Sequence, residues 1–273
     1  MRSRQQIIGG IEGTLVVVVP FRDGLVVASD TRSKILGHFC DGNNKVIFPG
    51  NWKSGFIAGT GMSEWISARV PLWPHDPCGD IAKNGITFFD AKEVAKAFVE
   101  AQSKPLADTD LEALFRHVIA KVEEVAASSP DYVRSFAGST MFQLVFGEYD
   151  EANKVTIVRS VQFNLNADFS YGGNINTQKL ELTSLPDYPH FGHTDAFNNH
   201  VIEGAGKEHL PKSLPAFEDK KKIEEVTRAE AEYIAIGLIE AAKKTSETVP
   251  DLMGIGGAID AYLLDSNGRQ KVR

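Results

Sequence analysis

The sequence predicts an α+β protein, with strands and helices grouped in blocks along the chain. Four short apolar runs joined by turns open it, and two helices, two longer strands, a third helix and a final strand follow. Strands joined by short turns pair in antiparallel sheets, because a parallel pair needs a crossover of a dozen or more residues. A doubly wound parallel sheet would instead alternate strands and helices.

The opening block is predicted to hold strands at 14–21, 25–30, 44–48 and 53–59. The first two form a hairpin around Asp23-Gly24, a dipeptide typical of tight turns, and their valine runs indicate burial on both faces. Pro49-Gly50-Asn51 separates the next two strands. A helix is expected after Gly61, followed by a surface insertion at 71–87, where prolines and glycines interrupt any periodicity.

The rest of the chain is predicted from apolar spacing, which is clearest where Leu111, Leu114, Val118 and Val122 share one helix face. Two stretches, 164–200 and 207–226, show no regular period, and the length of the first indicates a functional insertion or an assembly element. The predicted elements are helices at 90–104, 108–128 and 227–247 and strands at 140–148, 154–163 and 257–265.

The most informative site is Gly13-Thr14, where a threonine after a glycine opens the first strand. If the chain is cut before Thr14, that residue carries both a hydroxyl and a free α-amine, whose pKa of about 7.7–8.0 suits a base near neutral pH. A threonine paired with its own amine is a known nucleophile–base unit. Taken alone, the dipeptide fits equally a threonine that only packs on a sheet.

The block around Thr14 resembles the start of a β-subunit of the proteasome family, a group of N-terminal-nucleophile hydrolases. Asp30 lies sixteen positions after Thr14, and Arg32 follows at the family's spacing. Lys45, in NNKVIF, matches the family's lysine one residue early, which implies a shorter loop at 33–44. Gly59, in FIAGTG, lies fourteen positions after that lysine, as in the family.

The C-terminal part is also similar to this family. VIEGAG (201–206) resembles the strand that ends in the family's Gly-Ser-Gly turn, and Asp251 matches the aspartate of its Asp-x-x-Ser loop, which would support the new N-terminus. Ala205 and Gly254 stand where the family has serines. Two hydroxyls near the amine are therefore missing, which predicts slow catalysis.

The resemblance implies a role for each matched residue. Thr14 would attack a peptide carbonyl, and its amine would accept the hydroxyl proton. Lys45, held by Asp30, would lower the proton affinity beside the nucleophile. Gly59 would lend a backbone N–H to the oxyanion, and Arg32 would organise the site without touching the substrate.

The resemblance also implies a fold and an assembly, namely those of a bacterial proteasome-like subunit. Residues 1–13 would be a leader peptide, and residues 14–273 a single domain built as a four-layer αββα sandwich with two stacked antiparallel sheets. The protein would be a threonine endopeptidase acting inside stacked homo-oligomeric rings, with an ATP-dependent unfoldase left open as a partner. Two alternatives remain: an inactive shell or assembly protein of the same fold, and an N-terminal-threonine amidase acting on a small amide.

Composition and charge limit the classes of partner and location that the protein can have. The net charge of −7, from 29 basic and 36 acidic residues, argues against nucleic acid or an anionic membrane as a partner. The N-terminus lacks the apolar region of a secretory signal, and no apolar run approaches the ~20 residues that span a bilayer. Cys40 and Cys78 fit no disulfide framework or zinc spacing, which suggests unpaired cysteines in a reducing compartment. A cytoplasmic protein without metal or cofactor is expected.

Overall fold

A computed structural model describes most of the 273-residue chain. Several sequence predictions fall partly or wholly outside the described residues: the cut at Gly13, most of the leader, most of the insertion at 71–87 and parts of the stretches 164–200 and 207–226. The described residues are 9–12, 14–35, 37–68, 78–79, 85–102, 106–180, 182–183, 189–192, 194–211 and 221–273.

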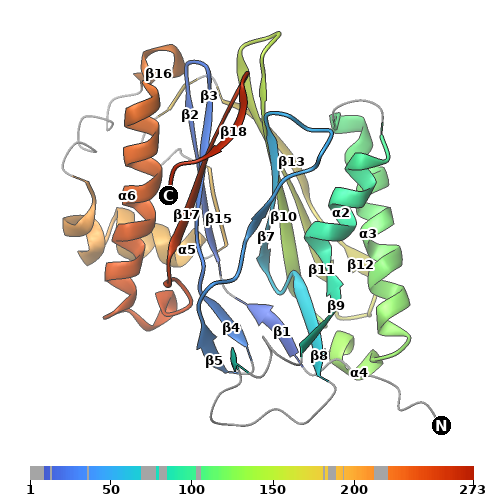
Figure 1. Cartoon of the computed structure of the whole chain (residues 1–273). Helices are drawn as coiled ribbons and strands as arrows, with labels where there is room; N and C mark the ends of the chain where they lie inside the picture. The colour runs from blue at the N-terminus through green and yellow to red at the C-terminus, as the bar shows by residue number, and fades with distance from the viewer. Residues whose placement is uncertain are drawn as a thin grey trace.

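The predicted α+β class with antiparallel sheets is confirmed, and two large sheets form the centre of the molecule (Figure 1). The first has the order β15 (His190–Gly192), β2 (Leu15–Phe21), β3 (Gly24–Asp30), β17 (Ile259–Asp265) and β18 (Gly268–Lys271). The second has the order β12 (Tyr171–Gly172), β11 (Val155–Leu165), β10 (Ser139–Asp150), β7 (Gly55–Gly61) and β6 (Val46–Ile47), with β13 (Ile175–Leu180) also paired to β11.

The valine run of β2 is explained by burial on both faces, as the sequence predicts. Alternate side chains of a strand point to opposite faces. Val17 and Val19 pack toward helix α6 (Arg228–Ser246), whereas Val16 and Val18 join an apolar cluster with Phe56 and Val145 of the second sheet. Every residue of β2 is buried, because the strand lies between a helix and a second sheet.

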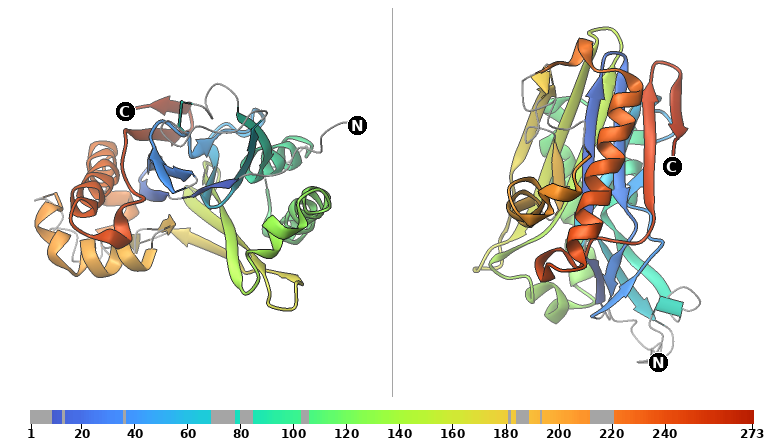
Figure 2. Two further views of the ribbon diagram at one scale, coloured as in Figure 1. Left: turned by 90° about the horizontal axis from the view of Figure 1, so that it is seen from below. Right: turned by 90° about the vertical axis from the view of Figure 1, so that its left-hand side faces the viewer.

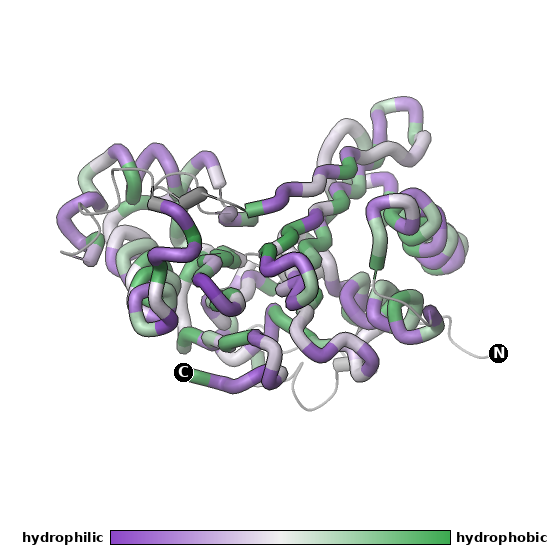
Figure 3. The backbone as a smooth tube through the Cα atoms, turned by 90° about the horizontal axis from the view of Figure 1, so that it is seen from above, coloured by the Kyte–Doolittle hydropathy of each residue, from purple (hydrophilic) through white to green (hydrophobic). Residues whose placement is uncertain are grey.

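Helices cover the outer face of each large sheet. Helix α6 lies against β2 and β3, and α2 (Ala91–Glu100) and α3 (Leu111–Ala126) pack with the buried side chains of β7, β10 and β11. Seen from below, α6 and the α2–α3 pair lie on opposite sides of the strands (Figure 2). The hydrophobic segments gather along the central strands and the inner faces of the helices (Figure 3).

A third sheet lies at the end of the molecule near the N-terminus (Figure 1). The prediction of a helix after Gly61 is wrong, because Trp65 and Ile66 are buried in a strand that pairs with a neighbouring strand on each side. This third sheet has the order β5 (His38–Cys40), β4 (Ser33–Ile35), β1 (Gly9–Glu12), β8 (Glu64–Ala68) and β9 (Gly85–Asp90). Its central strand, β1, comes from the segment predicted to be a leader.

Two predictions for the later chain are also wrong. VIEGAG (201–206) is not a strand, because one short helix ends at Ile202 and Ala205 begins another, which packs on α6. The stretch 164–200 is not irregular, since it contributes β12, β13 and β15. The remaining elements are η1 (Asp108–Asp110), α4 (Pro130–Arg134), β14 (Leu182–Thr183), α5 (Thr194–Phe197), η2 (Asn198–Ile202), η3 (Ala205–His209), β16 (Lys221–Lys222), η5 (Ile223–Glu225) and η6 (Pro250–Leu252).

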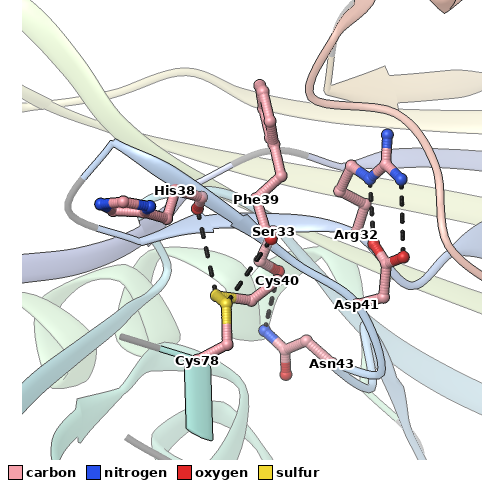
Figure 4. Close-up of a disulfide and its surroundings, with 8 residues drawn as sticks. All are labelled: Arg32, Ser33, His38, Phe39, Cys40, Asp41, Asn43 and Cys78. Carbon is pink, nitrogen blue, oxygen red and sulfur yellow. Dashed lines mark hydrogen bonds and ion pairs between the residues drawn. A yellow bond between two sulfur atoms is a disulfide. The ribbon is translucent and has the colours of Figure 1, made fainter. Parts of the chain in front are cut away.

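The expectation of two unpaired cysteines is wrong as well. Cys40 and Cys78 form a disulfide with their Cα atoms 5.5 Å apart (Figure 4). Spacing along the chain gave no sign of it, because the fold brings together residues 38 positions apart. Since disulfides persist mainly in oxidising environments, these cysteines do not support a reducing compartment. In the part of the chain that the structure describes, no helix is long and apolar enough to cross a membrane.

Candidate active site

Thr14 lies at the start of β2 and is buried, with 2% of its surface exposed. It lines a cavity of about 1140 Å³, together with residues from distant parts of the chain. Among the other lining residues are Thr60, His190, Thr194, Asp251 and Gly254. The predicted nucleophile therefore lies in the wall of this cavity.

Asp30 is fully buried at the end of β3 and accepts three backbone hydrogen bonds. Leu15 donates to Oδ1 at 2.9 Å, and Arg32 and Gly256 donate to Oδ2 at 3.2 and 3.0 Å. Burial raises the pKa of Asp30 to about 6, although these donors and the charge of Lys45 oppose the rise. Asp30 thus fixes the backbone beside Thr14 to two other segments.

Lys45 is buried beside the same carboxylate, with 3% of its surface exposed. Its ammonium donates a hydrogen bond to the hydroxyl of Ser33, which Asn43 also contacts at 3.1 Å. Burial lowers the pKa of Lys45 to about 8, while the negative charge of Asp30 opposes the change. The predicted lysine and aspartate are therefore brought together, and sequence reasoning missed Ser33 as a partner.

The N–H of Gly59 already has an acceptor in this structure. It donates to the carbonyl oxygen of Lys45 at 3.3 Å, so its predicted role toward an oxyanion requires that bond to open. The glycine itself is needed here, because an added Cβ would lie 2.6 Å from Ser63 Oγ and 2.9 Å from Lys92 Cγ. Side chains on that face leave no room for a larger residue.

Lys92, which sequence reasoning did not single out, is a second buried cation in this region. Its ammonium lies 3.6 Å from a carboxylate oxygen of Glu64 and 3.3 Å from one of Asp90. Its positive charge contributes to the lowered pKa of Lys45. The signal was present in the sequence, since Lys92 shares the buried stripe of α2 with Ala95 and Val99, where a charged residue is unusual.

The two supporting residues lie at the edge of the site. The guanidinium of Arg32 pairs with Asp41 at 2.9 Å, and both side chains are partly exposed. Asp251 lines the cavity, and its carboxylate lies 3.6 Å from His200 Nε2. Asp251 and Thr14 thus line the same cavity, and Asp251 has a histidine partner on another helix.

The neighbour of Thr14 on its outer side is β15, not the 201–206 segment. Gly192 pairs with Leu15, and a Cβ at Gly192 would collide with the carbonyl oxygen of Thr14. The positive φ of Gly192, 102°, also favours glycine. Of the two departures from the family pattern, Gly254 does line the cavity, whereas Ala205 lies in the short helix packed on α6.

The predicted leader enters this site as an extended strand. In β1, Ile11 pairs with Ile35 of β4 and Gly9 pairs with Ile66 of β8, both antiparallel. An extended peptide segment, held on both sides by backbone pairing, therefore ends one residue before the Gly13-Thr14 pair. Nothing in the sequence pattern pointed to this strand.

Neither a search of protein-family models nor a search of curated proteins found a match. Among solved structures, the chain is similar to the Anbu (Gly-1) mutant from Hyphomicrobium sp. strain MC1, with 14% identity and a TM-score of 0.43 over 96% of this chain and 86% of that one. It is also similar to Anbu (ancestral beta-subunit) from Yersinia bercovieri, with 10% identity and a TM-score of 0.47 over 94% of this chain and 86% of that one. No residue role is carried over from either protein.

Proposed function

We propose that this chain is a threonine endopeptidase of the N-terminal-nucleophile type, which cuts its own Gly13–Thr14 bond. One observation carries the proposal: the strand β1 is held extended between β4 and β8 and leads directly to a buried threonine. Asp30, which accepts a hydrogen bond from Leu15 next to that threonine, and the buried Lys45, whose charge interacts with Asp30, support it. A threonine that only packs on a sheet needs none of these features.

The self-cleavage follows from the chemistry of that threonine. The hydroxyl oxygen of Thr14 attacks the carbonyl carbon of Gly13, and the C–N bond between the two residues breaks as the C–O bond forms. The amine is thereby freed and the leader is held as an ester. Water then hydrolyses the ester, which releases the leader with a carboxylate and leaves Thr14 with a free hydroxyl and amine.

Turnover repeats these steps on a peptide from solution. Once β1 leaves, the facing edges of β4 and β8 present unpaired backbone N–H and C=O groups, to which an extended peptide can add as a strand. The amine of Thr14 accepts the hydroxyl proton during attack and donates it to the leaving amine. The ammonium of Lys45 stabilises negative charge beside the nucleophile.

We extend the proposal to the assembly of the protein on the basis of the sequence resemblance alone. Stacked homo-oligomeric rings would enclose the sites and restrict substrates to unfolded peptides, with an ATP-dependent unfoldase left open as a partner. The packing of α6, two large sheets and the α2–α3 pair supports the four-layer αββα arrangement of this class. A third sheet that includes the leader is an addition to that arrangement.

A second candidate is an inactive assembly protein of the same fold. Two observations favour it: the N–H of Gly59 is engaged with Lys45, and Gly254 supplies no hydroxyl to the cavity. Each missing hydrogen bond costs only about 0.5–1.5 kcal/mol. That loss slows a reaction without preventing it, so we favour the enzyme.

The test is covalent labelling by a peptide epoxyketone, which reacts with both a threonine hydroxyl and its free amine. We expect one label per chain, located on Thr14 by peptide mass mapping, together with hydrolysis of fluorogenic peptides. Thr14→Ala should abolish both. The matched control is Thr140→Ala, an exposed threonine in the wall of the same cavity, which should keep both.

Other outcomes would contradict the proposal that the protein is a threonine endopeptidase. A wild-type protein that keeps its leader and takes no label on Thr14 would leave the assembly protein as the better account. An amidase would instead take the label, lose the leader and cleave small amides in preference to peptides.

A further inference from the structure

The Cys40–Cys78 disulfide joins the two outer parts of the third sheet. Cys40 is the last residue of β5, at one edge of that sheet, and Cys78, in the connection between β8 and β9, lies next to it (Figure 4). The Cys78 sulfur lies 3.5 Å from the carbonyl oxygen of Phe39. The cross-link therefore runs from the β4–β5 hairpin to the connection between β8 and β9.

Strand pairing joins these two halves only through β1, as far as the described residues show. The order β5-β4-β1-β8-β9 places the leader strand between them. The halves also continue different large sheets, because β4 follows β3 in the first sheet and β8 follows β7 in the second. If the leader is released, both backbone ladders that connect the halves are lost.

A small apolar cluster lies with the disulfide across this junction. Ile35 of β4 and Ile66 of β8 are buried with Cys40, and Cys78 packs against them. Ile35 and Ile66 are the residues that pair with Ile11 and Gly9 of β1, one on each side. This cluster and the disulfide connect the two halves without backbone pairing to the leader.

The distance between the two halves of the third sheet affects the site that they border. Neighbouring strands lie about 4.7–4.9 Å apart, so β4 and β8 across one strand are roughly 10 Å apart, which fits one extended peptide. The β4–β5 hairpin also carries Ser33, which holds the ammonium of Lys45, and Phe39, which lines the cavity of Thr14. Movement of the hairpin would change both the peptide gap and the site.

We propose that the Cys40–Cys78 disulfide holds the two halves of the third sheet at peptide-binding distance after the leader leaves. The inference rests on the proposed peptidase function. The disulfide acts as a positioning element and touches no reacting atom. Reduction by a dithiol would convert the bond to two thiols, as the dithiol becomes a disulfide, and would let the hairpin move away from β8.

The test compares oxidised and reduced wild-type protein after loss of the leader. The reductant is dithiothreitol, and the probe is an eight-residue peptide with a fluorophore and a quencher. We expect reduction to raise KM on the order of tenfold, because a pre-positioned site becomes mobile, with a much smaller change in kcat. Cys78→Ser should behave like the reduced protein, and dithiothreitol should not change it further.

Hydrogen exchange gives a readout that does not depend on turnover. Amides of 33–35 and 64–68 should exchange faster after reduction in the cut protein. In uncut Thr14→Ala, where β1 still joins the halves, reduction should have little effect on them. An unchanged KM and unchanged exchange on reduction would overturn the role of the disulfide and leave the peptidase intact. An oxidised wild type that keeps its leader and hydrolyses nothing contradicts the peptidase itself, and this inference falls with it.

Discussion

At the scale of single residues, the region around Thr14 contains two buried lysines where the sequence resemblance indicated one. Lys45 contacts Ser33 and is coupled to Asp30, and Lys92 lies between two carboxylates. Buried ammonium groups are costly unless they are paired. Their charges interact with each other and that of Lys45 with Asp30, which holds the backbone next to Thr14, an arrangement typical of sites where charge serves chemistry.

Replacing Lys45 should abolish most activity. We expect Lys45→Met to lower the rate of peptide hydrolysis about 10²–10³-fold, as for loss of a group that stabilises transition-state charge. Lys45→Arg should not restore it, since a planar guanidinium cannot replace a compact ammonium in a closed site. Steady-state kinetics on the assembled protein measure both, and near-normal turnover by Lys45→Met would make this lysine purely structural.

The same residue predicts a pH dependence of stability. The pKa of Lys45 is lowered to about 8 in the folded protein, so between pH 8 and its ordinary 10.5 the unfolded chain binds more protons. The free energy of unfolding contributed by this lysine therefore rises with pH across that window. Urea unfolding of wild type and Lys45→Met from pH 7 to 10 should show the rise in wild type alone. Equal slopes in the two proteins would contradict the burial of a charged lysine.

Lys92 should set the upper pH limit of activity. Removing its charge in Lys92→Met should raise the pKa of Lys45 and move the loss of activity at alkaline pH upward by roughly one unit. Lys96→Met is the matched control, because Lys96 lies on the same helix in a surface pair with Glu93. A pH–rate profile measures the shift, and an unmoved alkaline limb would reduce Lys92 to a packing role.

The residues of the site were predictable to the extent that they lie at fixed spacings in the opening strands. The structure brings Asp30 and Lys45 together near Thr14 for this reason. Ser33 was not predictable, since the hydroxyl partner of a buried ammonium depends on tertiary packing. The position of Lys92 on the apolar face of α2 was visible in the sequence, but its ion pairs were not. The prediction that Ala205 lies in a turn after a strand was wrong, because a glycine-rich sequence is compatible with both a turn and a short helix.

At the scale of elements, the long segments with a strong period and the four opening strands were predicted correctly, and several other short strands were missed. Helices α2, α3 and α6 and strands β10 and β11 lie within a few residues of their predicted bounds. The strands β1, β8 and β15 were missed, because each is short and takes its stability from neighbours that are remote in sequence. The disulfide was missed for the same reason.

One buried ion network joins elements of the second sheet, and its loss should be costly. The guanidinium of Arg159 lies 2.5 Å from Glu148 and 2.8 Å from Asp108, and Trp52 donates to Glu148 at 2.7 Å. Arg159→Leu leaves the carboxylate of Glu148 buried without its charged partner. We expect a loss of about 3–5 kcal/mol in the free energy of unfolding and a fall in Tm of roughly 10 °C.

The control for that prediction is Arg116→Leu. Arg116 pairs with Glu112 on the exposed face of α3, so its loss should cost less than about 1 kcal/mol. Thermal unfolding followed by circular dichroism compares the two variants. Similar melting temperatures would show that the buried network contributes little.

At the scale of the whole molecule, the chain that precedes Thr14 is part of the folded structure. Strand β1 completes the third sheet and ends beside the cavity that Thr14 lines. The uncut chain thus presents its own backbone to the nucleophile, and Thr14 is buried in that state. The central claim is that this arrangement is the substrate complex of a self-cleavage reaction.

Intact mass spectrometry of the purified full-length protein tests that claim most directly. Wild type should lack residues 1–13 and begin with Thr14, whereas Thr14→Ala should keep the whole leader. Thr140→Ala, in the wall of the same cavity, should be processed like wild type. Loss of the leader from Thr14→Ala, or a wild type that keeps all thirteen residues and still hydrolyses peptides, would contradict the account.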